Sequence, residues 1–190
     1  MKFSEQKRCS WAEDSDEMRA YHDTEWGVPQ HNDQILFEYI MLDSFQAGLS
    51  WAIILKKRKG FRKAFAGFNF AKIAQFNKSK IVSLLKNKKI VRHKGKIEAT
   101  IQNAKVFLAI QKEFGSFSKY LWAWVKNKPI KNGWKPLEEI PARTELGDSI
   151  STDLKKRGFC FFGPTTCYAF LQGVGVINDH VVSCAQYKKV

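Results

Sequence analysis

Helix-start signals recur along this chain, whereas stretches that alternate apolar and polar residues, as strands do, are nearly absent. Asn32 or Asp33 can cap a helix that carries its apolar residues on one side and is broken by Gly48. Ser50 can then cap a helix over residues 51–59. Further starts are expected at Asn69, Ser79, His93 and Ser116. The pattern predicts an all-α protein with about eight helices.

The segment 147–175 has the order helix, short turn, helix. The first helix is expected to begin at Asp148 or Ser149 and to end near Gly158, and Pro164 suits the first turn of the second. Residues 127–146, which contain three prolines, are expected to form a loop. A hairpin between two helices can present backbone N–H groups to a phosphate, although glycine turns also occur in helical proteins that bind no DNA.

Composition excludes a membrane protein. The 190 residues are 44% hydrophobic and 26% charged, which is ordinary for a soluble chain with one core or two small helical lobes. No run of about 18 apolar residues could span a bilayer, and the first thirty residues lack an apolar signal segment. A cytoplasmic location is therefore expected. The four cysteines then favour metal binding or burial over disulfides.

The charge is distributed unevenly. Residues 1–50 hold 4 basic and 10 acidic side chains, whereas residues 56–105 hold 16 basic side chains and one acid, a balance of +15 within a net charge of +14. Such a surface concentrates polyanions and gains free energy by counterion release on nucleic acid. A solubilising surface is the plainer alternative. An anionic membrane is a weaker one, because the lysines are scattered over several short helices.

Two cysteines and two histidines lie near opposite ends of the chain. Cys9 and His22 are close to the start, and His180 and Cys184 are close to the end. The second pair would share one face if it lay in a helix, as metal ligands four residues apart must. Two thiolates and two imidazoles make a closed, structural type of zinc site. Buried cysteines with incidental histidines would give the same spacing.

The first third of the chain places aromatic residues beside acids. Trp11 and Trp26 stand in polar, loop-like surroundings, where core packing explains a tryptophan less easily. Together with Tyr21, Trp51 and Asp43 they could form an aromatic box with one carboxylate. Such a box suits a flat, cationic heterocycle, because the rings attract its faces and the carboxylate holds its edge. Core packing is the alternative.

Six segments of the chain closely resemble, in order, motifs of the DNA-3-methyladenine glycosylase I family, and the resemblance extends over about residues 7–187. These segments are RCSW at 8–11, YHDTEWGVP at 21–29, QAGLSW at 46–51, IVRHKGKI at 90–97, LKKRGF at 154–159 and NDHVV at 178–182. The resemblance implies a helix–hairpin–helix DNA glycosylase fold. It also implies hydrolysis of the N-glycosidic bond of 3-methyladenine in double-stranded DNA by a monomer.

The resemblance also implies roles for single residues. One structural zinc per chain would join the two ends through Cys9, His22, His180 and Cys184. The base pocket would be formed by Trp11, Tyr21, Trp26 and Trp51. The expected contacts of the hairpin with DNA are Lys155, Lys156, Arg157, Gly163 and Thr165. The family usually carries glutamate where this chain has Asp43, the predicted catalytic residue, whose shorter side chain changes its reach toward the base.

Two alternatives stay open at this stage. A separate aspartate downstream of the hairpin could stabilise the sugar cation, and Asp179 lies at a suitable distance along the chain. Its place beside His180 favours support of the metal ligand instead. A protein that binds alkylated bases without cleaving them would need the same fold, charge and aromatic box. Release of free base from alkylated DNA separates an enzyme from such a binder.

Overall fold

The computed structural model describes residues 7–190 and confirms the all-α prediction. Its helices are α1 (Asp16–Thr24), α2 (Asp33–Gln46), α3 (Trp51–Ala64), α4 (Phe70–Ile73), α5 (Lys78–Lys86), α6 (Lys94–Phe114), α7 (Phe117–Ala123), α8 (Glu145–Lys156) and α9 (Pro164–Gly173). Three short 3-10 helices, η1 (Ser10–Asp14), η2 (Ala66–Phe68) and η3 (Leu137–Glu139), and two strands, β1 (Ile130–Lys131) and β2 (Ile177–Asn178), complete the described elements.

Local capping explains most of the helix starts. The side chain of Asn32 accepts hydrogen bonds from the backbone of Gln34 and Ile35 at the start of α2. His93 and Ser116 cap α6 and α7 in the same way, as expected. Three expected starts need correction. Ser50 precedes α3 without a side-chain cap, and Asn77 rather than Ser79 caps α5. Helix α8, capped by Thr144, begins at Glu145 and so three residues before Asp148, the earlier of its two predicted starts.

The predicted loop 127–146 is more ordered than expected. Its strand β1 pairs in parallel with β2, Ile130 beside Ile177, and η3 follows. Gly175 lies just before β2 and adopts φ +71°, a backbone conformation that favours glycine. Its Cα is also too close to neighbouring backbone to leave space for a side chain. A Cβ at this position would lie 2.4 Å from the backbone nitrogen of Pro29. This close approach packs the C-terminal segment against the loop that follows α1.

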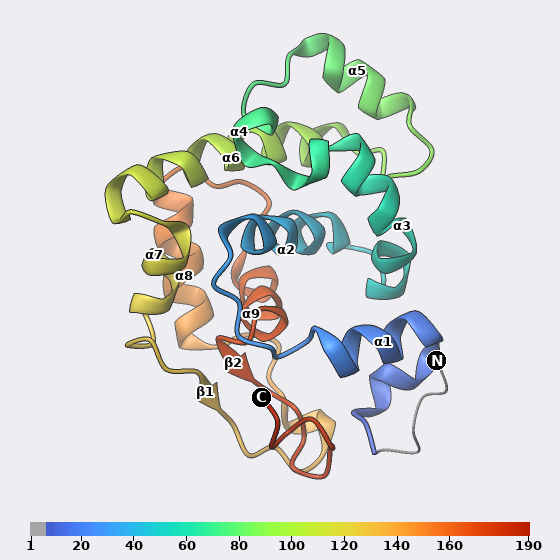
Figure 1. Cartoon of the computed structure of the whole chain (residues 1–190), viewed down its shortest axis with the longest axis vertical. Coiled ribbons are helices and arrows are strands. Elements are labelled where there is room, and N and C mark those ends of the chain that lie inside the picture. Colours follow the sequence, from blue (N-terminus) through green and yellow to red (C-terminus); the bar gives the residue numbers. More distant parts are fainter. Residues whose placement is uncertain (1–6) are drawn as a thin grey trace.

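Helix α2 lies at the centre of the molecule. Figure 1 shows it crossing the middle, with α3 and α6 on one side and α9 on the other, and α2 contacts all three. Every residue from Leu36 to Phe45 is buried. The expectation of one apolar side is therefore wrong, because neighbours surround this helix. Asp43, a polar residue in such a helix, needs an explanation.

One continuous hydrophobic core joins the helices. The buried cluster runs from Cys9, near the start of the described chain, to Cys184, near its end. Within residues 7–190, none of the helices is long and apolar enough to cross a membrane. The core thus places both ends of the described chain beside α1 and α9, where the site described next is found.

Candidate functional site

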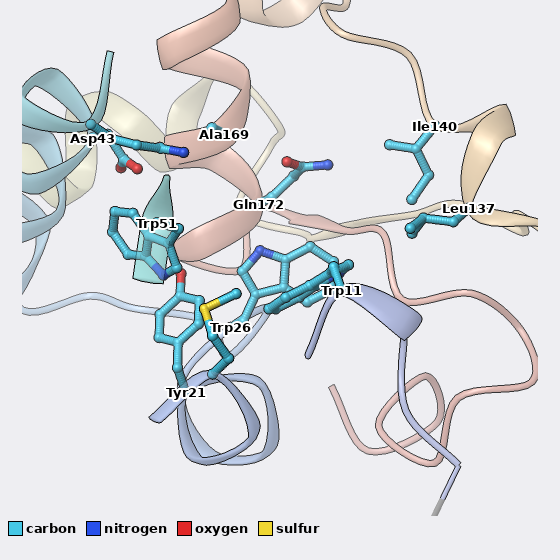
Figure 2. Close-up of a pocket in the computed structure, with 11 residues that line it drawn as sticks. Trp11, Tyr21, Trp26, Asp43, Trp51, Leu137, Ile140, Ala169 and Gln172 are labelled. Carbon is cyan, nitrogen blue, oxygen red and sulfur yellow. The ribbon is translucent and has the colours of Figure 1, made fainter. Parts of the chain in front are cut away.

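A pocket of about 360 Å³ opens between η1, α1, the α2–α3 connection, η3 and α9. Figure 2 shows aromatic side chains along one side, with Leu137 and Ile140 opposite and Gln172 between them. Asp43 and Trp51 lie close together at the end of the pocket away from Leu137 and Ile140. Its lining residues are Trp11, Met18, Tyr21, Trp26, Asp43, Gln46, Trp51, Leu137, Ile140, Ala169 and Gln172. All five residues predicted for the base site are therefore brought together.

The aromatic residues pack against one another as well as facing the pocket. Trp11 meets Trp26 edge to face, with ring centroids 5.0 Å apart, and Tyr21 lies 5.3 Å from Trp51 at a tilt of 54°. Trp11 and Trp51 are half-buried, whereas Tyr21 and Trp26 are nearly buried. Mutual packing fixes the rings, so the pocket presents preformed π faces to a flat ligand.

Asp43 is the most unusual residue of the pocket. It is 5% exposed, and its Oδ2 has no hydrogen-bond partner among the described residues. Burial raises the pKa of this carboxyl group well above its usual value. The indole Nε1 of Trp51 is also buried without a partner. Native proteins seldom leave such atoms unpaired, so one acceptor and one donor point to a polar ligand.

A buried lysine holds the backbone between Asp43 and Trp51. Lys96 of α6 donates to the carbonyl oxygens of Phe45, over 3.0 Å, and Ala47, over 2.6 Å. These groups belong to the last turn of α2, where carbonyls lack partners within the helix. Burial lowers the pKa of Lys96. The ammonium group thus fixes the α2–α3 connection and the pocket residues at both of its ends.

The four predicted metal ligands meet in one buried cluster. The ligand atoms of Cys9, His22, His180 and Cys184 lie within 4.8 Å of one another. Cys184 Sγ is 3.4 Å from His22 Nε2 and 3.5 Å from His180 Nδ1, and Cys9 Sγ is 3.7 Å from His180 Nδ1. Tetrahedral zinc bonds of usual length would separate sulfur and nitrogen ligands by about 3.5 Å. The cluster therefore fits one metal ion.

Hydrogen bonds set the tautomer of both imidazoles. His22 Nδ1 lies 2.9 Å from Asp23 Oδ1, and His180 Nε2 lies 3.2 Å from the carbonyl oxygen of Trp26. Because these oxygens accept, His22 Nδ1 and His180 Nε2 each carry the proton of their ring. His22 Nε2 and His180 Nδ1 then direct their lone pairs into the cluster. Asp23 is itself held by Arg8.

The thiols complete the donor set. Hydrogen bonding from the Cys9 thiol lowers the pKa of Cys184, while the same contact, together with burial, raises the pKa of Cys9. A cation bound in the cluster would displace the thiol protons, because metal ligands must be deprotonated. One detail of the sequence argument is wrong. His180 and Cys184 lie in a turn rather than a helix, with Cys184 N donating to Val181 O.

Asp179 does not contact its neighbour His180 through its side chain. It is fully buried, and its two oxygens accept from four side chains: Asn132, Trp134, Tyr168 and Gln172. The residue that supports a metal ligand is instead Asp23, beside His22. Asp179 is also absent from the residues that line the pocket, so its hydrogen bonds favour a structural role over contact with the sugar. Its four partners instead link β2 and α9 to residues 132–134.

The predicted DNA-contacting hairpin joins α8 to α9. Gly158 ends α8 at φ +103°, and Pro164 begins α9. The exposed residues predicted to contact DNA are Lys155, Lys156, Gly163 and Thr165. Arg157 differs, because its guanidinium pairs with Glu113 over 2.6 Å and with Asp153 over 2.7 Å.

Comparison with known proteins places the chain in a family. The model of the methyladenine glycosylase family matches residues 11–187. The chain belongs to this family. The DNA-3-methyladenine glycosylase of Haemophilus influenzae is 44% identical over 177 residues, covering 93% of this chain and 96% of the relative. DNA-3-methyladenine glycosylase 1 of Escherichia coli is 42% identical over 181 residues, covering 95% and 97%.

A solved structure agrees closely with the fold of this methyladenine glycosylase. It is a variant of 3-methyladenine DNA glycosylase I in complex with 3-methyladenine, and it is 34% identical with a TM-score of 0.92. The match covers 95% of this chain and 97% of that one. The resemblance drawn from the six sequence segments is confirmed.

The sequence argument missed part of the pocket of this methyladenine glycosylase. Leu137 and Ile140 come from the segment expected to be a loop, and Gln172 comes from the end of α9. Gln46 stands in the recognised QAGLSW segment and was available as a signal. Nothing in the local sequence around Leu137 marks it as a pocket residue, because it approaches the aromatic wall only through tertiary folding.

Proposed function

We propose that this chain is a base-excision repair enzyme that hydrolyses the N-glycosidic bond of 3-methyladenine in double-stranded DNA. The observation that carries the proposal is the buried, unpaired Oδ2 of Asp43 within the aromatic pocket. An acceptor without a donor favours a ligand that brings both N–H groups and positive charge. Adenine methylated at N3 within DNA brings both, since its ring is cationic and its amino group donates.

The positive charge of the base also simplifies the chemistry. Departure of the base neutralises it, so no strong general acid is required, and water captures the oxocarbenium-like sugar. Asp43 would accept from the adenine edge, while Tyr21 and Trp51 would enclose the ring. The nucleotide must first leave the base stack, which costs a few kcal/mol and less at a damaged pair.

The hairpin between α8 and α9 is proposed to hold the DNA backbone as a helix–hairpin–helix motif. Lys155 and Lys156 are exposed beside it, and Gly163 and Thr165 lie exposed at the start of α9. Backbone N–H groups at a helix start suit a phosphate, and such contacts position DNA without reading its sequence. Arg157 stays in the predicted set, although two carboxylates already engage it. We expect the protein to act as a cytoplasmic monomer.

The metal proposed for the Cys9, His22, His180 and Cys184 cluster is zinc. Two thiolates and two imidazoles fill a tetrahedral shell, which leaves no open position for substrate. When bound, the ion would supply structural cross-linking rather than catalysis. It would join η1 and α1 to the C-terminal turn.

Release of free base tests the proposed activity. Duplex DNA methylated to give 3-methyladenine is incubated with the protein, and the released bases are separated by chromatography. The expected result is time-dependent release of 3-methyladenine, with none from an enzyme-free control. Tight binding to alkylated DNA without release would replace the enzyme with a lesion-binding protein.

A further inference from the structure

Gln172, at the end of α9, lines the pocket with a side-chain amide that is held in one orientation. Its Nε2 donates to Asp179 Oδ2 over 2.8 Å. Both oxygens of Asp179 act as acceptors for other side chains as well, so a flipped amide would set oxygen against oxygen. Figure 2 shows the oxygen end of Gln172 turned toward the side of Asp43 and Trp51.

Asp179 is itself held firmly enough to fix this orientation. Asn132 and Trp134 donate to its Oδ1 over 2.7 and 2.6 Å, and Tyr168 and Gln172 donate to its Oδ2. The four donors together occupy the four lone-pair positions of the carboxylate group and hold it in one orientation. Asp179 is fully buried, so water does not compete for these bonds.

The backbone of Gln172 is fixed as well. Its carbonyl oxygen accepts from Gly27 N over 3.1 Å and from Gly175 N over 3.2 Å. Within the described residues, the amide oxygen Oε1 has no hydrogen-bond partner of its own. Two acceptors of the described residues therefore serve the pocket without a protein donor: Asp43 Oδ2, which is buried, and Gln172 Oε1, whose side chain is half-buried.

We propose that Gln172 is a specificity-determining residue that accepts one N–H of the exocyclic amino group of the methylated adenine, while Asp43 accepts the other. This inference deepens the proposed function and rests on it. The 6-amino group is the only hydrogen-bond donor of 3-methyladenine, and it carries two N–H bonds. Asp43 Oδ2 and Gln172 Oε1 can each accept one N–H bond of this amino group. Asp179 is the positioning residue, because it prevents the amide from turning.

The same arrangement rejects a base that carries oxygen at position 6. Such a base would set its oxygen against Gln172 Oε1, and the amide of Gln172 could not turn to donate without leaving Asp179. A site built around a hydrogen bond discriminates strongly against a ligand that cannot make it. The hydrogen bond between Gln172 of α9 and Asp179, which follows β2, therefore favours 6-amino over 6-oxo purines.

Binding of two free bases tests this inference without depending on catalysis. 3-Methyladenine and 3-methylhypoxanthine differ at position 6, and quenching of tryptophan fluorescence gives a Kd for each. The measured quantity is the ratio of the two Kd values. Damage to the pocket as a whole would weaken both bases together and leave this ratio unchanged.

Two variants should change the ratio in different ways. Gln172→Leu should reduce the preference for 3-methyladenine by about tenfold or more, mainly through weaker binding of that base. Asp179→Asn should reduce it mainly through better binding of 3-methylhypoxanthine, because the amide is then free to turn. Gln75→Leu, which makes the same change at an exposed position outside the pocket, is the control and should keep the native ratio. If Gln172→Leu fails to fold, Gln172→Met replaces it.

The inference is overturned if native protein binds both bases equally, or if folded Gln172→Leu and Gln172→Met keep the native ratio. Release of 3-methyladenine from DNA by native protein, with an unchanged ratio in these variants, would refute the role of Gln172 and leave the proposed function standing. Native protein that neither binds 3-methyladenine nor releases it would overturn both.

Discussion

Trp26 of the aromatic pocket packs edge to face against His180 of the metal cluster, with ring centroids 4.5 Å apart and an angle of 78° between the planes. The backbone oxygen of Trp26 also accepts from His180 Nε2. Trp26 also stacks on His22, the second imidazole of the cluster. One wall of the pocket therefore rests on two metal ligands, so loss of the metal should disturb base binding as well as folding.

Cys184→Ser is expected to remove the metal and weaken binding of 3-methyladenine together. Elemental analysis should show about one zinc per native chain and little in the variant. The melting temperature should fall by about 10 °C or more, because a structural metal contributes several kcal/mol and each kcal/mol corresponds to about 2–4 °C in a chain of this size. Fluorescence titration with the free base should show weaker binding at a temperature where the variant is still folded.

Cys160→Ser is the matched control for this prediction, because Cys160 is exposed on the hairpin and lies outside the cluster. It should keep the native zinc content and melting temperature. The structural role of the cluster is wrong if Cys184→Ser retains both stability and metal. If stability falls while base binding stays native, the support of Trp26 by His180 is unimportant for the pocket.

Local signals in the sequence predicted most of the helices, and their failures have physical causes. Asn32 and Asn69 cap helices through contacts within three residues, so the sequence alone reveals them. Strands β1 and β2 are two residues long and pair across 47 positions, which leaves no periodic pattern to detect. The start of α8 was misplaced because Thr144 follows a proline-rich stretch that resembles a loop.

The sequence likewise predicted some residues of the site and did not reveal others. Family motifs contained the metal ligands and the aromatic residues, and the structure brings both sets together. The role of Gln172 was not visible, because it depends on the direction of an amide that Asp179 fixes after folding. The buried position of Lys96 was equally hidden, since a lysine within a basic segment is expected to be exposed.

Affinity for undamaged duplex DNA should decrease steeply as salt increases. Each phosphate contact adds about 0.9 to the slope of log K against log salt, so replacing Lys155 and Lys156 by alanine should lower the slope by up to about 2. Titrations at several salt concentrations measure this. Replacement of the exposed pair Lys188 and Lys189 removes the same charge and should change the slope less. Equal effects of the two pairs would contradict the hairpin interface.

Lys96→Met should loosen the α2–α3 connection. The carbonyl oxygens of Phe45 and Ala47 would lose the ammonium donor, which should cost roughly 1–3 kcal/mol in the free energy of unfolding. Base binding should weaken too, because this backbone joins Asp43 to Trp51. Denaturant unfolding and base titration measure the two effects. Lys94→Met is the control, since that side chain is 71% exposed, and native stability in Lys96→Met would refute the bridging role.

Asp43 gives the sharpest test of the pocket. Asp43→Asn keeps the size of the side chain but loses its charge, so excision of 3-methyladenine should decrease by about tenfold or more, given a loss of roughly 1–3 kcal/mol for one buried hydrogen bond. Binding to undamaged DNA should stay native. Asp43→Glu should keep or raise activity, because it restores the length usual in the family. Single-turnover release of base measures all three proteins, and normal excision by Asp43→Asn would refute the assignment.

Asp43→Asn, which should lower excision, should raise the stability of the protein, and the size of this gain should depend on pH. Burial raises the pKa of Asp43 in the folded protein, so the stability that its neutral form contributes is present at low pH and is lost as pH rises through that raised pKa. Asp43→Asn removes this loss and should therefore equal the native protein in acid and exceed it at higher pH. Melting temperatures across a pH series, measured without base, test this. A variant less stable than native at high pH would show that the empty pocket already stabilises the carboxylate.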